Sequence, residues 1–254
     1  MKALISILVF LQIQTLHAMG HYKPGDTLYV WAMSGLTLRD GPSLNTAKLA
    51  TIPYGTALKV LNYNGAHRTV VVAVPGYKAG QESNPAVELD GDFAEVTFKG
   101  LKGYLFDGYL SILPTFKYYK TADSGSPNFE NLEEWATRSF GLLQKTQTGT
   151  FEYGIASTSQ SIFGNGILIS TWIEKGGQTR IVLPNISMEE AFLIFNCMNN
   201  YEWQILSQNQ ANLEGFRYEK TNMEAWLFST GAFETTIRYL PHEYLVIISD
   251  YCSC

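Results

Sequence analysis

The chain has 254 residues, enough for one large domain or two smaller ones, and its 46% apolar and 16% charged residues are typical of a folded protein. A net charge of −5 with no basic block argues against a nucleic-acid binder, because that affinity comes mainly from neutralising phosphates. A mean hydropathy of −0.04, with one long apolar run at the N-terminus, excludes a polytopic membrane protein. The 13% aromatic content favours a β-rich structure.

Residues 1–20 have the order of regions typical of a secretory signal peptide. Lys2 precedes an apolar stretch, Ala3 to Leu11, and small residues follow at Ala18 and Gly20. This stretch is shorter than the roughly 20 apolar residues that span a bilayer. We therefore expect an exported protein, periplasmic or secreted, with no stable membrane insertion after signal removal. An uncleaved N-terminal anchor is the alternative.

Residues 26–62 alternate short apolar runs with turn signals, as do residues 93–113. Dense turn signals stand at Asp40-Gly41-Pro42-Ser43 and at Pro53-Tyr54-Gly55-Thr56. Turns at this spacing are typical of short antiparallel strands, so the sequence predicts a small β-barrel here.

Two runs in this part resemble the bacterial SH3 (SH3b) domain. The run SGLTLRDGPSLNTAKLATIPYGTALKVL resembles its first half, with Leu38-Arg39, Gly41-Pro42-Ser43 and Pro53-x-Gly55 at the expected spacings. The run DFAEVTFKGLKGYLFDGYLS resembles its second half. The resemblance implies an SH3-like small β-barrel over residues 21–113. Residues 63–92 form a longer insertion than the family usually carries, and we expect an extra hairpin there.

The resemblance also implies a binding function. Aromatic side chains of such barrels commonly line a shallow groove for an extended peptide, here a cell-wall peptide or an envelope protein. Arg39 is expected to brace Asp40 or a backbone carbonyl. The competing interpretation of the aromatic residues is that they fill or cover the core of the barrel. The candidate groove residues are Tyr29, Trp31, Tyr54, Tyr104 and Tyr109.

Residues 114–130 lack periodicity and are predicted to be a linker. Asn131–Phe140 has apolar residues at helical spacing, whereas Phe151–Ile155 and Ile162–Ile173 are predicted to be strands. A turn at residues 174–178 leads into a further strand, Thr179–Leu183.

Ser187-x-x-Glu190 is a capping box that opens a helix ending at about Asn199. This order of elements predicts an α+β domain with an antiparallel sheet over residues 131–254, for which no family is recognised and no internal repeat is seen. The remaining apolar or aromatic runs are Trp203–Leu206, Phe216–Tyr218, Ala225–Phe228, Thr235–Leu240 and Tyr244–Ile248.

The three cysteines, Cys197, Cys252 and Cys254, leave at least one thiol outside any internal disulfide. A Cys252–Cys254 bridge would close a very tight ring, so we expect Cys197 to pair with one of the terminal cysteines. Cys197 lies opposite the helix face that carries Met188 and Phe192, where it is free to hold the chain end.

The sequence carries no recognisable catalytic or metal-binding constellation. Cys197 lies near the end of its helix, where the dipole raises a thiol pKa, and the one downstream histidine is His242. The adjacent acids Glu133-Glu134 and Glu189-Glu190 are interpreted as helix-dipole partners. We expect a non-enzymatic binding protein without a metal or cofactor. The alternatives are a peptidoglycan hydrolase or hydrolase subunit, with its site in residues 131–254, and a barrel that serves only as a structural adaptor.

Overall fold

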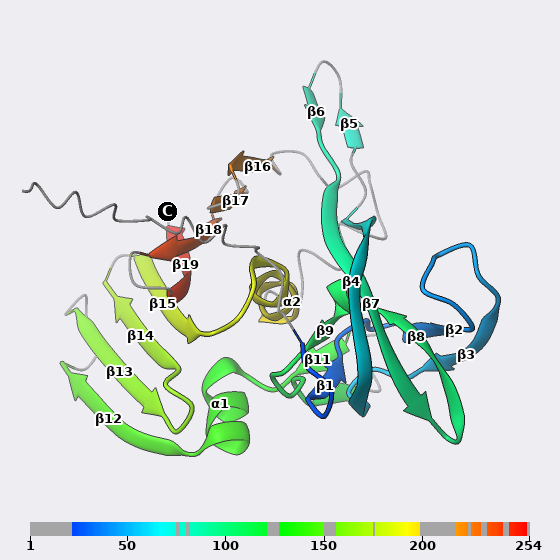
Figure 1. Cartoon of the computed structure of the whole chain (residues 1–254). Helices are drawn as coiled ribbons and strands as arrows, with labels where there is room; N and C mark the ends of the chain where they lie inside the picture. Colours follow the sequence, from blue (N-terminus) through cyan, green and yellow to red (C-terminus); the bar gives the residue numbers. More distant parts are fainter. Residues whose placement is uncertain are drawn as a thin grey trace, which may run out of the picture.

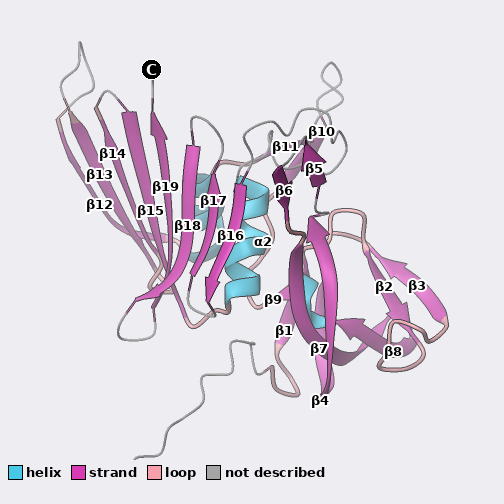
Figure 2. Cartoon of the chain, turned by 90° about the horizontal axis from the view of Figure 1, so that it is seen from above, coloured by secondary structure: helices cyan, strands magenta, loops and turns pink. Residues whose placement is uncertain are grey.

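The chain is mainly β, with two α-helices and several antiparallel sheets among the described residues (Figures 1 and 2). The expected mainly β class is confirmed, whereas the predicted signal peptide lies outside the described part. The computed structural model describes residues 22–74, 77–79, 82–120, 127–149, 156–174, 176–198, 217–222, 225–229, 233–240 and 244–252.

The N-terminal unit, residues 22–113, is built on a seven-stranded antiparallel sheet with the order β3-β2-β8-β7-β4-β1-β9. A 3₁₀ turn, η1 (Asp107–Tyr109), precedes its last strand. The strands are β1 (Thr27–Val30), β2 (Leu36–Arg39), β3 (Lys48–Ile52), β4 (Ala57–Val74), β7 (Val87–Phe98), β8 (Leu101–Phe106) and β9 (Leu110–Ser111). The described strands do not close into the expected barrel, since β3 and the two-residue β9 remain separate edges.

Two local expectations for this unit are confirmed. The insertion forms a long hairpin, in which β4 and β7 run out from the rest of the unit and carry β5 (Tyr77–Ala79) and β6 (Glu82–Asn84) near the tip (Figure 1). Arg39 donates from Nη1 to the carbonyl oxygen of Thr46 at 2.7 Å, and so braces the turn that follows β2.

The connecting segment, residues 114–130, is part of the fold rather than a bare linker. It holds a two-stranded sheet of β10 (Tyr118–Lys120) and β11 (Pro127–Phe129). Phe116 and Phe129 of this segment are both buried. Because single buried aromatic residues leave no periodic pattern, the sequence did not show that this segment packs.

The C-terminal unit, residues 131–252, contains an antiparallel sheet and two helices, as predicted, and both helices lie on one face of the sheet (Figure 1). Its described strands follow the order β12-β13-β14-β15-β19-β18-β17-β16. The elements are α1 (Leu132–Phe140), β12 (Leu142–Thr148), β13 (Ser157–Phe163), β14 (Leu168–Ile173), β15 (Gly176–Pro184), α2 (Met188–Met198), β16 (Arg217–Asn222), β17 (Ala225–Ser229), β18 (Phe233–Leu240) and β19 (Tyr244–Cys252).

This unit repeats one topology twice, although its sequence shows no repeat. Helix α1 is followed by β12 to β15, and helix α2 is followed by β16 to β19. The last strands of the two halves, β15 and β19, pair along their whole length from Gly176↔Cys252 to Pro184↔Tyr244. The two halves thereby share one continuous sheet (Figure 2).

The strand predictions for this unit were correct in part. The run Ile162–Ile173 is two strands, because Gly166 takes a positive φ of 84° in a turn that the Phe163 amide closes on the carbonyl oxygen of Ile167. Strand β12 was missed, since every one of its residues is exposed. The predicted runs Phe151–Ile155 and Trp203–Leu206 lie outside the described residues.

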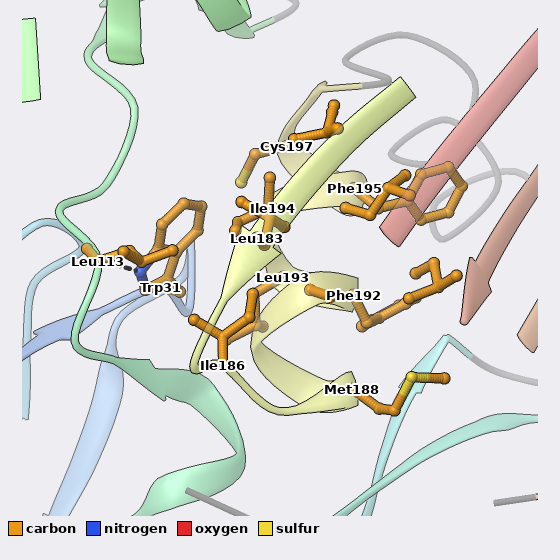
Figure 3. Packing of buried hydrophobic residues seen from close by; sticks show 14 of the residues in the cluster. Trp31, Leu113, Leu183, Ile186, Met188, Phe192, Leu193, Ile194, Phe195 and Cys197 are labelled. Carbon is orange, nitrogen blue, oxygen red and sulfur yellow. Dashed lines mark hydrogen bonds between the residues drawn. The ribbon is translucent and has the colours of Figure 1, made fainter. Parts of the chain in front are cut away.

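A single hydrophobic cluster joins the two units through the connecting segment. Phe116 stacks on Trp135 of α1 at 4.8 Å between ring centroids and meets Trp31 edge-on at 5.8 Å. The two indole N–H groups donate to consecutive backbone carbonyls, from Trp31 to Leu113 at 3.0 Å and from Trp135 to Pro114 at 2.7 Å. Figure 3 shows the Trp31 ring between Leu113 and the side chains of α2 and β15.

Glu190, in the first turn of α2, ties the helix to the N-terminal unit. The predicted capping box is present, with Ser187 N–H donating to Oε2 of Glu190 at 3.0 Å and Glu190 N–H donating to the Ser187 hydroxyl at 3.1 Å. The other oxygen, Oε1, accepts the backbone N–H of Ile112 at 3.1 Å. Burial raises the pKa of this carboxyl, while hydrogen bonds from Ser111 and Tyr22 are among those that act to lower it. One side chain therefore caps α2 and holds β9.

Replacing Glu190→Ala should cost about 3 kcal/mol of unfolding free energy, because it leaves the buried backbone N–H of Ser187 and the partly buried N–H of Ile112 without an acceptor. The control is Glu134→Ala, which removes the equivalent residue of the capping box of α1, where the box is exposed. That change should cost about 1 kcal/mol or less. Urea unfolding of both variants measures the difference, and equal losses would show that Glu190 acts only as a helix cap.

Candidate functional site

A groove of about 680 Å³ lies where the N-terminal unit meets the connecting segment and α1. Its size lies within the range of ordinary ligand pockets. It is lined by Tyr29, Met33, Ser34, Gly35, Thr51, Pro53, Tyr54, Gly55, Pro114, Thr115, Phe116, Lys117, Tyr118 and Arg138. We call this cavity the tyrosine groove.

Two tight turns shape one wall of the tyrosine groove, and both need glycine. Gly35 has a φ of +83°, and a Cβ there would lie 2.7 Å from the Thr51 side chain. Gly55 has a φ of +77°, and its N–H donates to the carbonyl oxygen of Val30 at 2.8 Å. The turn signal at Pro53-Tyr54-Gly55-Thr56 predicted the second of these turns, and both require glycine, so this wall follows from local turn chemistry.

Tyr54 fixes the floor of the groove against the C-terminal unit. Its hydroxyl donates to the carbonyl oxygen of Phe116 at 3.2 Å and lies 3.9 Å from Sγ of Cys197. Its ring meets Phe129 edge-on at 6.1 Å. Burial is the largest cause that raises the pKa of Tyr54, so the hydroxyl keeps its proton as a donor.

The groove carries a positive charge at one end. Arg138 donates to Thr115 O at 2.9 Å and forms a forked ion pair with Glu130, which also accepts the Lys117 N–H at 2.6 Å. Burial acts to raise the pKa of Glu130, but these donors lower it overall, so the Arg138 charge is neutralised. Among the described residues the Lys117 ammonium group has no ion-pair partner, and no acidic side chain lines the groove.

The structure brings together two of the five candidate groove residues, Tyr29 and Tyr54. Trp31 is 2% exposed and belongs to the core between the units, so its ring is not available to a ligand. Tyr104 lies in β8 beside Arg39 and Glu95 of neighbouring strands, outside the groove. Tyr109 is half-buried and packs on Phe106 at 6.2 Å between ring centroids.

Sequence reasoning missed the wall contributed by the connecting segment. Phe116, Lys117 and Tyr118 line the groove, and Met33 adds an exposed apolar side chain at the opposite turn. The signal was present as the dense aromatic run Phe116-Lys-Tyr-Tyr119 in a segment otherwise poor in apolar residues. Only its contact with the N-terminal unit identifies it as a wall.

A much smaller cavity lies where η1 meets the first turn of α2. It measures about 10 Å³, room for a single water molecule, and is lined by acids of both units. Asp107 accepts hydrogen bonds from the Tyr63 hydroxyl and the Asp92 N–H, both at 2.6 Å. Burial raises the pKa of Asp107 and of Glu189 to about 7. Oε2 of Glu189 has no hydrogen-bond partner among the described residues.

Cys197 does not have the setting of a nucleophile. It is buried beneath Tyr54, and burial raises the pKa of its thiol to about 12, so it stays protonated at neutral pH. His242, Cys254 and the side chain of Cys252 lie outside the described part, so the disulfide stays a prediction. Within the described ranges no group of three or more His, Cys, Asp or Glu side chains is placed to hold a metal ion. No helix there is long and apolar enough to cross a membrane.

No family model, curated protein or solved structure matches this chain.

The two buried carboxyls should make the protein more stable in mild acid. Asp107 and Glu189 bind a proton more tightly in the folded chain than in the unfolded one, so the free energy of unfolding falls as the pH rises from about 4 through about 7. Stability at pH 5 should exceed stability at pH 8 by on the order of 5 kcal/mol.

Urea unfolding at the two pH values tests this, and the double variant Asp107→Asn/Glu189→Gln should flatten the dependence. The control is Glu133→Gln, because Lys145 is the main cause that lowers the pKa of Glu133 and its titration falls below this window. If the pH dependence of the free energy of unfolding persists in the double variant, it comes from groups other than Asp107 and Glu189.

Proposed function

We propose that this chain is an exported binding protein, and that its tyrosine groove holds an extended peptide segment of the cell wall or of an envelope protein. The observation that carries the proposal is the groove itself, an open cavity of about 680 Å³ with tyrosines from three separate segments on its walls. Tyrosine and methionine side chains offer contact area to an extended chain, and their distribution on opposite walls suits a ligand that lies between them.

The likeness of the N-terminal unit to an SH3b domain is part of the same proposal. Strand β9 pairs with β1, and β1 pairs with β4, so the end of the unit returns to its beginning. The turn with Gly55, one of the residues that carry the resemblance, stands at the rim of the groove. These features support an SH3-like ancestry for a sheet that remains open.

The positive charge at one end of the tyrosine groove indicates which kind of peptide it would bind. Arg138 is held in an ion pair by Glu130, whereas the Lys117 ammonium group forms no such close pair in the described structure, although its charge also helps to lower the pKa of Glu130. A peptide with a carboxylate close to its apolar or aromatic residues matches this arrangement. Binding should therefore weaken as salt increases.

Purified insoluble peptidoglycan should co-sediment with the mature chain. The double variant Met33→Ala/Tyr118→Ala should weaken this binding tenfold or more, a loss of about 1.4 kcal/mol, because it removes two exposed contacts on opposite walls. Both side chains are more than a third exposed, so the fold should persist, and circular dichroism checks that it does.

Tyr104→Ala is the matched control, since it removes a tyrosine of the same unit that lies outside the groove. It should bind as the parent does. Parent and double variant that sediment equally would show that wall contact lies elsewhere. A parent that does not sediment at all would remove cell-wall peptide as the ligand.

A further inference from the structure

The outer face of the C-terminal sheet, opposite the helices, carries a further hollow. Ser161 donates to Glu133 of α1 at 2.9 Å, and Ile169, Ile181 and Leu183 lie in the core, so these residues mark the inner face. Because side chains alternate along a strand, their neighbours on β13, β14 and β15 face outward. A cavity of about 420 Å³ lies over these outward residues.

The strand registers place this lining in two rows of four opposed residues. The first row is Thr148, Thr158, Trp172 and Gln178. The second row is Thr146, Gln160, Ser170 and Arg180. With strands about 4.8 Å apart, the rows form a platform roughly 14 Å wide. We call these eight residues the Trp172 platform.

The Trp172 platform combines one exposed aromatic ring with hydroxyl and amide side chains and one guanidinium group. Trp172 is 42% exposed and is the one aromatic residue of the two rows. Hydroxyls and amides surround it, and some are already held to one another, with Gln160 Nε2 donating to Ser170 Oγ at 3.4 Å and the Thr148 and Thr158 hydroxyls in contact. The Arg180 guanidinium makes no ion pair among the described residues.

We propose that the Trp172 platform binds an oligosaccharide. A sugar ring has one face of C–H groups and a rim of hydroxyls. Its C–H face stacks on a flat aromatic side chain, and its hydroxyls form hydrogen bonds with polar side chains next to that ring. The indole of Trp172 supplies the first, and the amides and hydroxyls of both rows supply the second. Arg180, whose five donors form no ion pair among the described residues, offers a place for an acidic or acylated substituent.

The lining favours a glycan over the other occupants of a sheet surface. A peptide that extends the sheet pairs with the edge strand β12 and makes no use of Trp172 on the third strand along. A helix or a second copy of this chain needs an apolar face, and the platform has a single apolar side chain. A nucleic acid needs several cations, whereas the platform has one and the chain carries a net charge of −5.

The platform also differs from an ordinary solvated face in being hollowed. Single exposed aromatic residues are common on protein surfaces and carry little meaning alone. Here the indole lines a cavity of about 420 Å³ together with the six hydroxyl or amide residues and the one guanidinium group of the two outward rows. That volume lies within the range of small-ligand pockets.

The test is binding of the mature chain to an array of immobilised bacterial, plant and animal oligosaccharides. The parent should be retained by at least one of them, and Trp172→Ala should lower that affinity tenfold or more. Trp172→Tyr, which keeps an aromatic ring, should recover part of the loss. Arg180→Gln should weaken binding of acidic or acylated sugars more than of neutral ones.

Indole N–H resonances of the parent locate the contact. Titration with the retained sugar should shift the signal that is missing from Trp172→Ala and leave those of the buried Trp31, Trp135 and Trp226 unmoved.

Two controls separate this proposal from the tyrosine groove. Leu143→Ala removes a side chain that is 70% exposed on β12 outside the platform and should bind sugar normally, as should Met33→Ala/Tyr118→Ala. An array that retains nothing, or that retains Trp172→Ala as well as the parent, overturns the proposal. Neither result bears on the groove, whose ligand is a peptide.

Discussion

The stack of Trp31, Phe116 and Trp135 is the contact on which the rest of the structure depends. Each indole anchors a backbone carbonyl of the chain between the units, and Phe116 fills the space between the two rings. Through these contacts the connecting segment, which has no periodic apolar pattern, packs against both the N-terminal and the C-terminal unit. The tyrosine groove exists because this segment stands opposite the turn at Gly35, so interface and candidate site have one structural cause.

Three buried carboxyl groups, those of Asp107, Glu189 and Glu190, are a second feature of the junction between the units, and burial raises the pKa of each. Glu190 has hydrogen-bond donors for both of its oxygens, and these donors offset part of the cost of burying it while it holds a helix start and a neighbouring strand at once. Asp107 and Glu189 lie in the same seam with fewer donors, and each is most easily buried with a proton. The junction between the units therefore combines the hydrogen bonds of Glu190 with two carboxyl groups, Asp107 and Glu189, that stabilise the folded chain more when they are protonated.

Local chemistry made parts of this structure predictable. The capping box of α2 follows from Ser187 and Glu190, which are neighbours on one helical turn, and the groove turns follow from glycines in short turn motifs. Long-range packing was not predictable. Tyr29 and Trp31 stand two residues apart and share a side of the chain, yet one lines the groove and the other is covered by the C-terminal unit. Strand β12 could not be predicted, because none of its residues is buried and its sequence has no apolar alternation. Its backbone pairing with β13 holds it in the sheet.

The positions of the two proposed sites limit how one ligand could use both. The tyrosine groove lies on the helix side of the C-terminal sheet, since Arg138 of α1 is part of its lining, whereas the Trp172 platform is on the opposite face. A short peptide-bearing sugar cannot reach around the sheet edge to fill the two together. If both sites bind a peptidoglycan network, they engage separate strands of it, and the gain comes from raised local concentration rather than from a shared ligand. A soluble fragment should then bind each site independently, and only the insoluble polymer should show the combined affinity.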